Sequence, residues 1–488
     1  MAVIFHLLNS VDHSSVLLLV SCLLLAGIQL LQRYSFSSWK QFFFTRRKNQ
    51  LPPFISASLP FFGHAFAYGK NPKEFLLNAY RKYGPAFRFT MMGKTFTFLV
   101  GPEASREFYY SPNDQLNGEE MNSKITTPIL GKDTAYDVPH SVMLEQFRLI
   151  RKSGLTRNRM EEYASVIEDE VTQYLEEKWG ETGSIDILHT FRELCVRCGP
   201  KCLLGTDVTK AVNLDLYHDL ISGFHPLVMT IPSFMQSAVF YKRDRANAKI
   251  RKIFQEIINK RREEPTREDD TLQRLMESKN KHGQPLTDTE LIGIMTALMT
   301  LGTEEPSITS TWFGLFLAKH QDVQEQIYQE QMEDASGLDY KVLEKYPALE
   351  RGLKETLRLR PPAFTFIRKC RKDKDVLDYT LTPGTMTCIS IIVNQTLPEI
   401  WGEDAEDFKP DRFIDFGNNP RQQASYTPFG AGTHKCLGPN FAMLEMKTIW
   451  ATILRKYKLE LPSERFPVED RTTLFLIPDD KKVIYKKR

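Results

Sequence analysis

Apolar residues recur every three to four positions through most of residues 102–360, and this spacing constrains the fold more than any other feature of the sequence. EYASVIEDEVTQYLEEKW (162–179) and ANAKIRKIFQEIINKRR (246–262) show it clearly, as amphipathic helices do. Strand character is confined to AFRFTMMGKTFTFLVG (86–101), which indicates a hairpin around Gly93-Lys94, and to MTCISIIVNQ (386–395). The sequence therefore predicts one large, mainly α-helical domain with a small β region.

An uncharged apolar run, SSVLLLVSCLLLAGIQLL (14–31), precedes this domain. At 1.5 Å per residue it just reaches across a hydrocarbon layer of about 30 Å. No Lys or Arg lies before the run, which argues against a cleaved signal peptide. The basic residues follow it, so the positive-inside tendency leaves the body of the chain in the cytosol: Arg33, Lys40, Arg46, Arg47 and Lys48. We predict a transmembrane anchor over 1–32, a basic and proline-rich hinge over 33–60, and the main domain over 61–488.

The composition excludes two classes of protein. The 64 Lys and Arg residues are nearly balanced by 61 Asp and Glu, so no basic excess indicates nucleic acid as a partner. Seven cysteines in 488 residues do not make a disulfide framework. Three of them, Cys195, Cys198 and Cys202, are close enough to suggest a metal site. Positions i, i+3 and i+7 also share one helical face, and no second Cys/His cluster completes four ligands, so a structural role is favoured.

Two segments contain charged residues that could form ion pairs with one another. In LKETLRLRPP (353–362), Glu355 and Arg358 lie one helical turn apart, before Pro361 ends the helix. FKPDRF (408–413) adds Arg412. A buried Glu355 held between two guanidinium groups would pin two distant segments of the chain together. We predict a structural cluster of these three residues.

The loop YTPFGAGTHKCLG (426–438) places Cys436 among glycines, with His434 and Lys435 beside it. Together with the two charged segments it resembles the motif set of the cytochrome P450 family of haem-thiolate monooxygenases. The matching residues are Glu355 and Arg358, then Pro410, Arg412 and Phe413, then Phe429, Gly432, Cys436 and Gly438. The resemblance implies that family's helical fold, a haem b cofactor and Cys436 as the thiolate ligand of its iron.

A thiolate, not a thiol, ligates iron, so the loop is expected to favour the anion. Glycines let backbone amides approach the sulfur, and the predicted helix at 440–457 adds positive potential at its N-terminus. The alternative for Cys436 is a buried, inert cysteine. The resemblance also implies an NADPH-dependent cytochrome P450 reductase as electron donor, docking near Lys435, Lys447, Arg455 and Lys456, and the endoplasmic reticulum membrane as location.

Several segments resemble the sterol 14α-demethylase branch, its animal members most. They include ITTPILGKDTAYDVP (125–139), MLEQFRLIRKSGL (143–155) and ITSTWFGLFLAKH (308–320). This resemblance implies that Tyr136, Arg368 and His434 hold the haem propionates, with Arg148 as a candidate fourth because Phe147 stands where a lysine is expected. It also implies that Phe364 and Phe366 line the substrate pocket.

The departures fall in the helix expected over the haem. Where the sterol branch carries AGQHT, this chain reads LGTEE, so Leu301 replaces a small residue and Glu305 replaces the threonine whose hydroxyl helps deliver protons. Glu304 takes the family's acid position, and Pro306 removes a helical amide. Two adjacent carboxyl groups in a dry pocket are unlikely both to ionise, so one of them is expected to hold a proton for oxygen activation. Asn122 and Leu130 replace the Tyr and Phe that the branch places over its substrate.

Two classes of function stay open. The first is a membrane-bound monooxygenase that removes the 14α-methyl group of a sterol with O2 and NADPH-derived electrons, or a diverged paralogue that oxidises another lipid. The second is a haem protein that binds a sterol-like ligand without ordinary monooxygenation. The altered helix favours the second class, whereas the cysteine loop does not discriminate between them.

Overall fold

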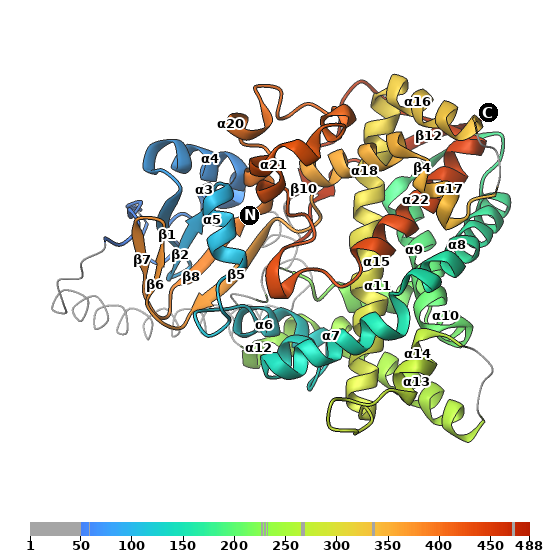
Figure 1. The fold of residues 1–488 in the computed structure, drawn as a ribbon, viewed down its shortest axis with the longest axis horizontal. Coiled ribbons are helices and arrows are strands. Elements are labelled where there is room, and N and C mark those ends of the chain that lie inside the picture. Colours follow the sequence, from blue (N-terminus) through green and yellow to red (C-terminus); the bar gives the residue numbers. More distant parts are fainter. Residues whose placement is uncertain are drawn as a thin grey trace, which may run out of the picture. The chain divides into compact units, whose positions relative to one another are not determined.

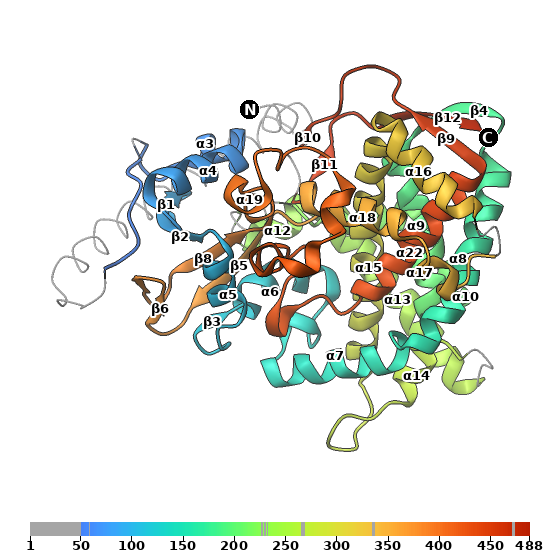
Figure 2. The same cartoon turned by 45° about the horizontal axis from the view of Figure 1, so that its top comes forward.

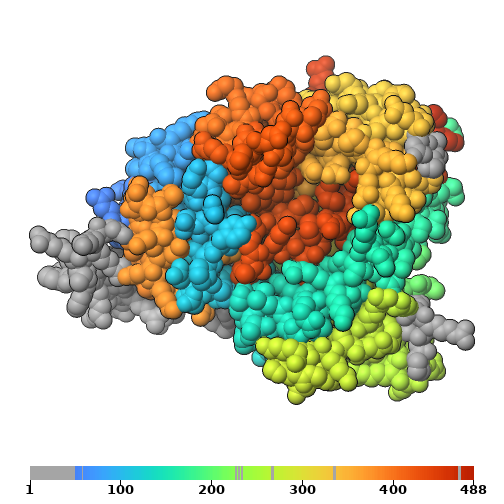
Figure 3. Space-filling view, viewed as in Figure 1, coloured from blue at the N-terminus to red at the C-terminus, as the bar shows by residue number. Residues whose placement is uncertain are grey.

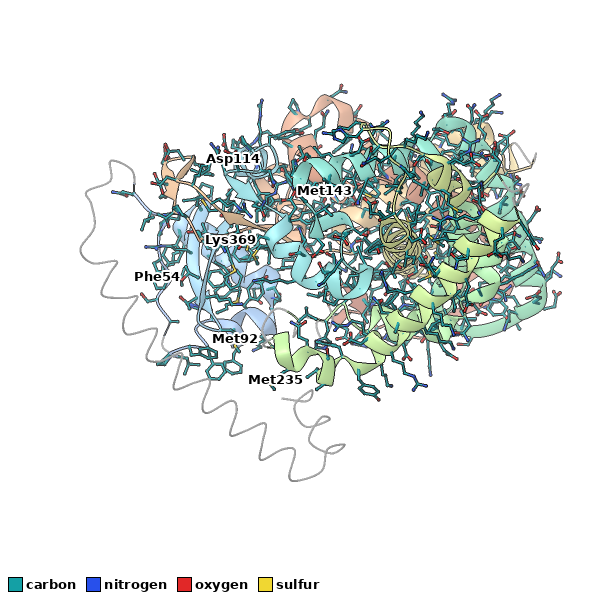
Figure 4. All side chains as sticks on the ribbon, turned by 90° about the horizontal axis from the view of Figure 1, so that it is seen from below. Phe54, Met92, Asp114, Met143, Met235 and Lys369 are labelled. Carbon is teal, nitrogen blue, oxygen red and sulfur yellow. The ribbon has the colours of Figure 1, made fainter. Side chains whose placement is uncertain are left out.

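One long helix, α15 (Asp288–Lys319), runs through the middle of the helical region and is seen along its axis from below (Figure 1, Figure 4). It begins at a capping box, in which the Thr287 hydroxyl accepts a hydrogen bond from the Glu290 amide and the Glu290 carboxylate accepts one from the Thr287 amide. From Leu291 onward most of its residues are buried, as expected of a helix that is enclosed on all sides.

The computed structural model describes residues 50–57, 59–225, 228, 231, 233–264, 269–333, 337–470 and 474–488. The apolar run 14–31, predicted as a membrane anchor, lies outside these residues. None of the described helices is both long and apolar enough to cross a bilayer. Residues Leu51–Arg488 form one compact unit.

Several of the described helices pack directly against α15. They are α6 (Glu119–Leu130), α9 (Ile187–Leu204), α13 (Tyr241–Glu263), α14 (Thr271–Glu277), α16 (Gln321–Met332), α18 (Pro347–Leu359) and α22 (Pro439–Lys456). The remaining described helices are α3 (Ala65–Lys70), α4 (Pro72–Tyr83), α5 (Pro102–Tyr109), α7 (His140–Gly154), α8 (Arg157–Lys178), α10 (Thr206–Ala211), α11 (Leu214–Ile221), α12 (Ser233–Val239), α17 (Tyr340–Glu344), α19 (Ile391–Asn394), α20 (Pro398–Trp401) and α21 (Pro420–Ser425), with short 3-10 turns η1 (Ala135–Asp137), η3 (Pro410–Phe413), η4 (Phe416–Asn418) and η5 (Gly432–His434).

A five-stranded sheet lies to one side of the helices, in the order β1-β2-β8-β5-β3 (Figure 2). Its strands are β1 (Ala86–Met91), β2 (Lys94–Leu99), β8 (Met386–Ser390), β5 (Thr365–Cys370) and β3 (Leu116–Asn117). The smaller sheets contain β4 (Thr182–Asp186), β12 (Lys482–Lys487) and β9 (Tyr457–Glu460); β6 (Lys374–Val376) and β7 (Tyr379–Leu381); and β10 (Glu469–Asp470) and β11 (Ile477–Pro478). The mainly helical fold with a small β region is therefore confirmed.

The predicted hairpin is present, with Phe87 opposite Phe98, and its turn uses positive φ at Met92 and Gly93. The second predicted strand is only half right, because β8 ends at Ser390 and α19 begins at Ile391. Residues 387–395 are buried throughout, and a continuously buried run has the same apolar pattern whether it is strand or helix.

Cys195, Cys198 and Cys202 lie on one buried face of α9, within the main hydrophobic core. All three are free thiols. Among the described residues they belong to no group whose ligand atoms are close enough to hold a metal ion. The prediction that the three cysteines share one face of a helix is therefore confirmed.

Candidate active site

Cys436 lies between η5 and the start of α22, in a loop that is closed by a 2.9 Å hydrogen bond from its own amide to the Phe429 carbonyl. Gly432 has φ +68°, and a Cβ there would lie 2.2 Å from the Tyr109 carbonyl oxygen, so only glycine fits. The other motif glycine, Gly438, is the N-cap residue of α22. The orange-red segment that contains this loop occupies the hollowed middle of one face of the molecule (Figure 3).

The protein groups around Cys436 do not by themselves hold a thiolate. Burial raises the pKa of its thiol to about 11, and the charge of Glu305 acts in the same direction. The Gly438 amide and Lys435 act the other way, as predicted from the loop, but they are the weaker influences. The loop therefore acts in the expected direction, but in the absence of iron its effect is outweighed by burial. The positive charge of a bound metal ion is what deprotonates a coordinating thiol.

Glu305 lies on α15 within electrostatic reach of this loop, since its charge raises the pKa of both Cys436 and Tyr136. The Glu305 side chain retains some accessible surface, yet protein atoms surround it. This burial, and after it the charge of Glu304, raises the pKa of Glu305 to about 7. A carboxyl group with such a pKa holds a proton in a large share of molecules at neutral pH.

Glu304 points the other way and is already paired. The Arg192 guanidinium donates to both of its oxygens, and the Tyr217 hydroxyl lies 3.1 Å from Oε2. The Glu304 side chain is 2% exposed and that of Arg192 is 21% exposed, so the carboxylate is buried while its cationic partner reaches partly into solvent. Of the two adjacent carboxyl groups, only Glu305 therefore lies toward the cysteine loop without a cationic partner in the described structure. Arg192 and Tyr217 come from α9 and α11, and no spacing in the sequence indicated either partner.

Tyr136, Arg368 and His434 lie together beside the loop. The rings of Tyr136 and His434 stack with centroids 6.0 Å apart, and the charge of Arg368 acts on both side chains. Both ring nitrogens of His434 are buried and have no hydrogen-bond partner among the described residues. Burial and then Arg368 lower the pKa of His434 to about 4. Unpartnered nitrogens beside a buried guanidinium suit two carboxylates, so these residues fit the propionates of a haem.

Glu119 and His140 were not identified from the sequence, yet they complete the surroundings of His434. His140 Nδ1 lies 2.5 Å from Glu119 Oε1, and His434 Nε2 lies 3.8 Å from the same oxygen. Among the described residues, these three form the one group whose ligand atoms are close enough to hold a metal ion. Glu119 and His140 are separated by 21 positions and come from different helices, so nothing in the spacing indicated the contact.

Arg148 does not join this group. Its side chain is 51% exposed on α7 and makes two hydrogen bonds to Glu145, of 2.9 Å and 2.7 Å. A helical i, i+3 partner on its own surface holds it away from the loop. The neighbouring position, Phe147, is no substitute donor, so the described structure offers three propionate partners rather than four.

The predicted cationic docking surface is also smaller than expected. Lys435 is exposed, but Lys447 is buried and lies 3.1 Å from Glu350. Arg455 donates to the Tyr346 hydroxyl at 2.8 Å, and Lys456 lies 3.8 Å from Glu176. Lys447 is therefore corrected from a docking residue to an internal partner of Glu350, because the buried face of α22 carries it inward.

Glu355, Arg358 and Arg412 lie together in a separate cluster of charges. Glu355 and Arg358 are both fully buried and share hydrogen bonds of 2.7 Å and 2.8 Å. Arg412 Nε lies 3.4 Å from Glu355, and the Lys409 amide donates to the same carboxylate at 2.9 Å. Arg358 also donates to the Gln395 carbonyl, so the cluster joins α18 to the segment that leads to the cysteine loop.

The residues expected over the substrate are distributed among different surroundings. Leu130 and Leu301 belong to the main helical core, whereas Phe364 packs with the sheet core and stands edge-on to Tyr68. Phe366 stands edge-on to Tyr109. The Asn122 amide donates to the Gly118 carbonyl of its own helix, so its polar end is already satisfied. The described contacts do not bring these five side chains into one group.

The whole arrangement matches one family. The cytochrome P450 family matches residues 52–485, and the chain belongs to it. Lanosterol 14-alpha demethylase from Rattus norvegicus is 42% identical over 444 residues, which cover 90% of this chain and 88% of that protein. The human lanosterol 14-alpha demethylase is 41% identical over 90% of this chain and 87% of that protein. Sterol 14-demethylase from Arabidopsis thaliana is 32% identical over 91% of this chain and 94% of that protein.

Among solved structures, cyanobacterial CYP120A1 with bound retinoic acid has the same fold, with a TM-score of 0.80 and 24% identity, over 91% of this chain and 100% of that one. The predicted membership of the cytochrome P450 family, nearest to animal sterol 14-demethylases, is thus confirmed. The chain is a cytochrome P450 monooxygenase, an oxidoreductase.

Proposed function

We propose that this chain is a membrane-bound haem-thiolate enzyme that removes the 14α-methyl group of a sterol, with O2 and electrons passed from NADPH by cytochrome P450 reductase. The observation that carries the proposal is the convergence of Cys436, Arg368 and the unpartnered His434 in a chain 42% identical to lanosterol 14-alpha demethylases. Haem supplies the activation of dioxygen when it is bound through Cys436. Tyr136, Arg368 and His434 would orient it through its propionates.

In this proposal Glu305 holds the proton that oxygen activation consumes. Glu304 is engaged by Arg192 and Tyr217, so it serves to position α15 rather than to release a proton. A carboxylic acid with a pKa of about 7 is matched to proton transfer near neutral pH. The role that a threonine hydroxyl has in the sterol branch would thus pass to an acid.

Attachment to the endoplasmic reticulum membrane is part of the proposal. The apolar run 14–31 would anchor the chain as a single span. Phe54, Phe62 and Phe66 are between 43% and 64% exposed at the N-terminal end of the described unit, where Phe54 stands at the edge of the sheet region (Figure 4). Exposed phenylalanines of this kind suit a lipid surface. Lys435 remains as an exposed cation for the reductase.

Product analysis tests the function most simply. The full-length chain in membranes, with NADPH and the reductase, is offered a panel of 14α-methyl sterols and their 14-demethylated analogues as controls. The proposal expects loss of the 14α-methyl group from at least one sterol. NADPH consumption without an oxidised sterol would contradict it.

A ligand-binding haem protein is the second candidate, favoured by Leu301 and Glu305 in the positions of a small residue and a threonine. It predicts that sterols shift the haem absorption spectrum while no sterol product accumulates. The same preparation distinguishes the two, because binding and product are measured separately.

A further inference from the structure

Glu445 on α22 carries a carboxyl group that has no role in the site described above. It is fully buried, and neither of its oxygens has a hydrogen-bond partner within the described structure. Unpartnered buried polar groups are rare, and each calls for an explanation. The Glu355 carboxylate, equally buried, receives several donors, so burial alone does not explain the difference.

The oxygen atoms that lie near Glu445 at Gly199 are acceptors. A Cβ added at Gly199 of α9 would lie 3.3 Å from Glu445 Oε1, 3.6 Å from the Gly302 carbonyl oxygen and 3.7 Å from Thr303 Oγ1. Three oxygens, one from α22 and two from α15, therefore surround one point on α9, and the missing side chain of Gly199 is what lets them approach. The Thr303 hydroxyl donates its own proton to the Met299 carbonyl, so at this point it too is an acceptor.

The Gly302 carbonyl lacks its usual helical donor. In an α-helix it would accept the amide of the fourth residue on, but that residue is Pro306, which has no N–H. The proline inside α15 thus frees an acceptor on the turn that carries Glu305, and the Glu445 carboxyl group lies near this acceptor.

We propose that Glu445 is a neutral carboxylic acid that donates a hydrogen bond to the carbonyl which Pro306 leaves free, directly or through one water, and so positions the Glu305 turn of α15. The positioning effect rests on the proposed role of Glu305, whereas the hydrogen bond does not. An ionised carboxylate among acceptors would be repelled by them, whereas a protonated one supplies the missing donor. The titratable groups that act with it are the thiols of Cys195, Cys198 and Cys202, which are neutral because burial raises the pKa of each. Burial also raises the pKa of Glu445.

Infrared difference spectroscopy of the haem-loaded protein tests the bond without turnover. The parent minus Glu445→Gln should show the carbonyl band of a protonated carboxylic acid at pH 7. Pro306→Ala should shift that band, because a restored amide then competes for the Gly302 carbonyl. Absence of the band, or a band that Pro306→Ala does not move, would overturn the proposal. A parent that oxidises no sterol leaves this measurement intact.

The ratio of sterol product to peroxide, which measures coupling, tests whether Glu445 positions the Glu305 turn of α15. Glu445→Met removes the donor and should lower the ratio of sterol product to peroxide by about five- to tenfold, the size expected for one buried hydrogen bond. Glu445→Gln keeps a donor and should restore most of the ratio. In a Pro306→Ala background the effect of Glu445→Met should fall to within about twofold, as a coupled pair requires.

Gln331→Met on α16 is the matched control, since it also replaces a fully buried polar side chain by methionine. It should leave coupling unchanged. If Glu445→Met behaves like this control at equal haem content, Glu445 does not position the α15 turn.

Discussion

Two buried carboxyl groups of this protein, Glu355 and Glu305, differ in what surrounds them. The Glu355 carboxylate accepts hydrogen bonds from Arg358 and the Lys409 amide and forms an ion pair with Arg412. Its negative charge is therefore balanced. Glu305 has Glu304 next to it and acts electrostatically on the Cys436 thiol, and burial raises the pKa of Glu305 to about 7. A buried carboxylate that is balanced by donors stabilises the fold, whereas a buried carboxyl group without such donors can exchange its proton. We therefore assign a structural role to Glu355 and a catalytic role to Glu305.

The largest expected effect is that of Cys436→Ala. Loss of the sulfur removes the proposed iron ligand, so the red-shifted carbon-monoxide band of thiolate-ligated haem should disappear entirely. The measurement is the reduced carbon-monoxide difference spectrum of membranes that contain the parent or the variant. Cys198→Ala is the control, because that thiol is buried in the core of α9, and it should keep the band. Persistence of the band in Cys436→Ala would exclude this ligand.

Glu355→Ala tests the structural role of the Glu355 carboxylate. It leaves Arg358 fully buried without its carboxylate, at a cost of about 3–5 kcal/mol in the free energy of unfolding. Poorly folded protein with little haem is the expected outcome, measured by haem content per chain and by urea unfolding. A variant that folds and binds haem like the parent but has lost turnover would mean that Glu355 is catalytic, and the comparison would fail.

Arg368→Ala and Arg148→Ala compare a buried with an exposed arginine, and both are expected to have smaller effects than Glu355→Ala. Arg368 is 4% exposed and donates to the Phe108 carbonyl at 2.8 Å, so its loss should lower haem retention clearly. Arg148 belongs to an exposed pair with Glu145, and its loss should leave both the free energy of unfolding and haem retention essentially unchanged. Transfer of haem to apomyoglobin measures retention. Equal transfer rates for the two variants would contradict the assignment of Arg368 to the propionates.

Sequence reasoning reached the fold because its signals are local. Helical spacing, the Gly93 turn and the loop around Cys436 can each be recognised within about twenty residues, and the ordered motifs identified the family. The segment 386–395 was only partly predicted, because full burial removes the alternation that separates strand from helix. Arg192, Tyr217, His140 and Glu445 were missed because their partners lie far away in the chain, and only packing of the helices brings them together. Arg148 differs from the expectation because Glu145, one helical turn away, pairs with it on the exposed surface of α7.

The central claim is that Glu305, and not its satisfied neighbour Glu304, carries the proton for oxygen activation. The measurement is the ratio of sterol product to peroxide for the parent, Glu305→Gln and Glu304→Gln, from pH 6 to pH 8.5, at equal haem content. Because only the protonated acid donates, the parent should be best coupled below about pH 7 and lose coupling as the pH rises through that value. Glu305→Gln should be at least about tenfold less coupled and show no such dependence. Glu304→Gln should lower stability, through its loss of charge beside Arg192, while keeping the pH dependence of the parent. Unchanged coupling in Glu305→Gln, with the pH dependence lost in Glu304→Gln instead, would contradict the account.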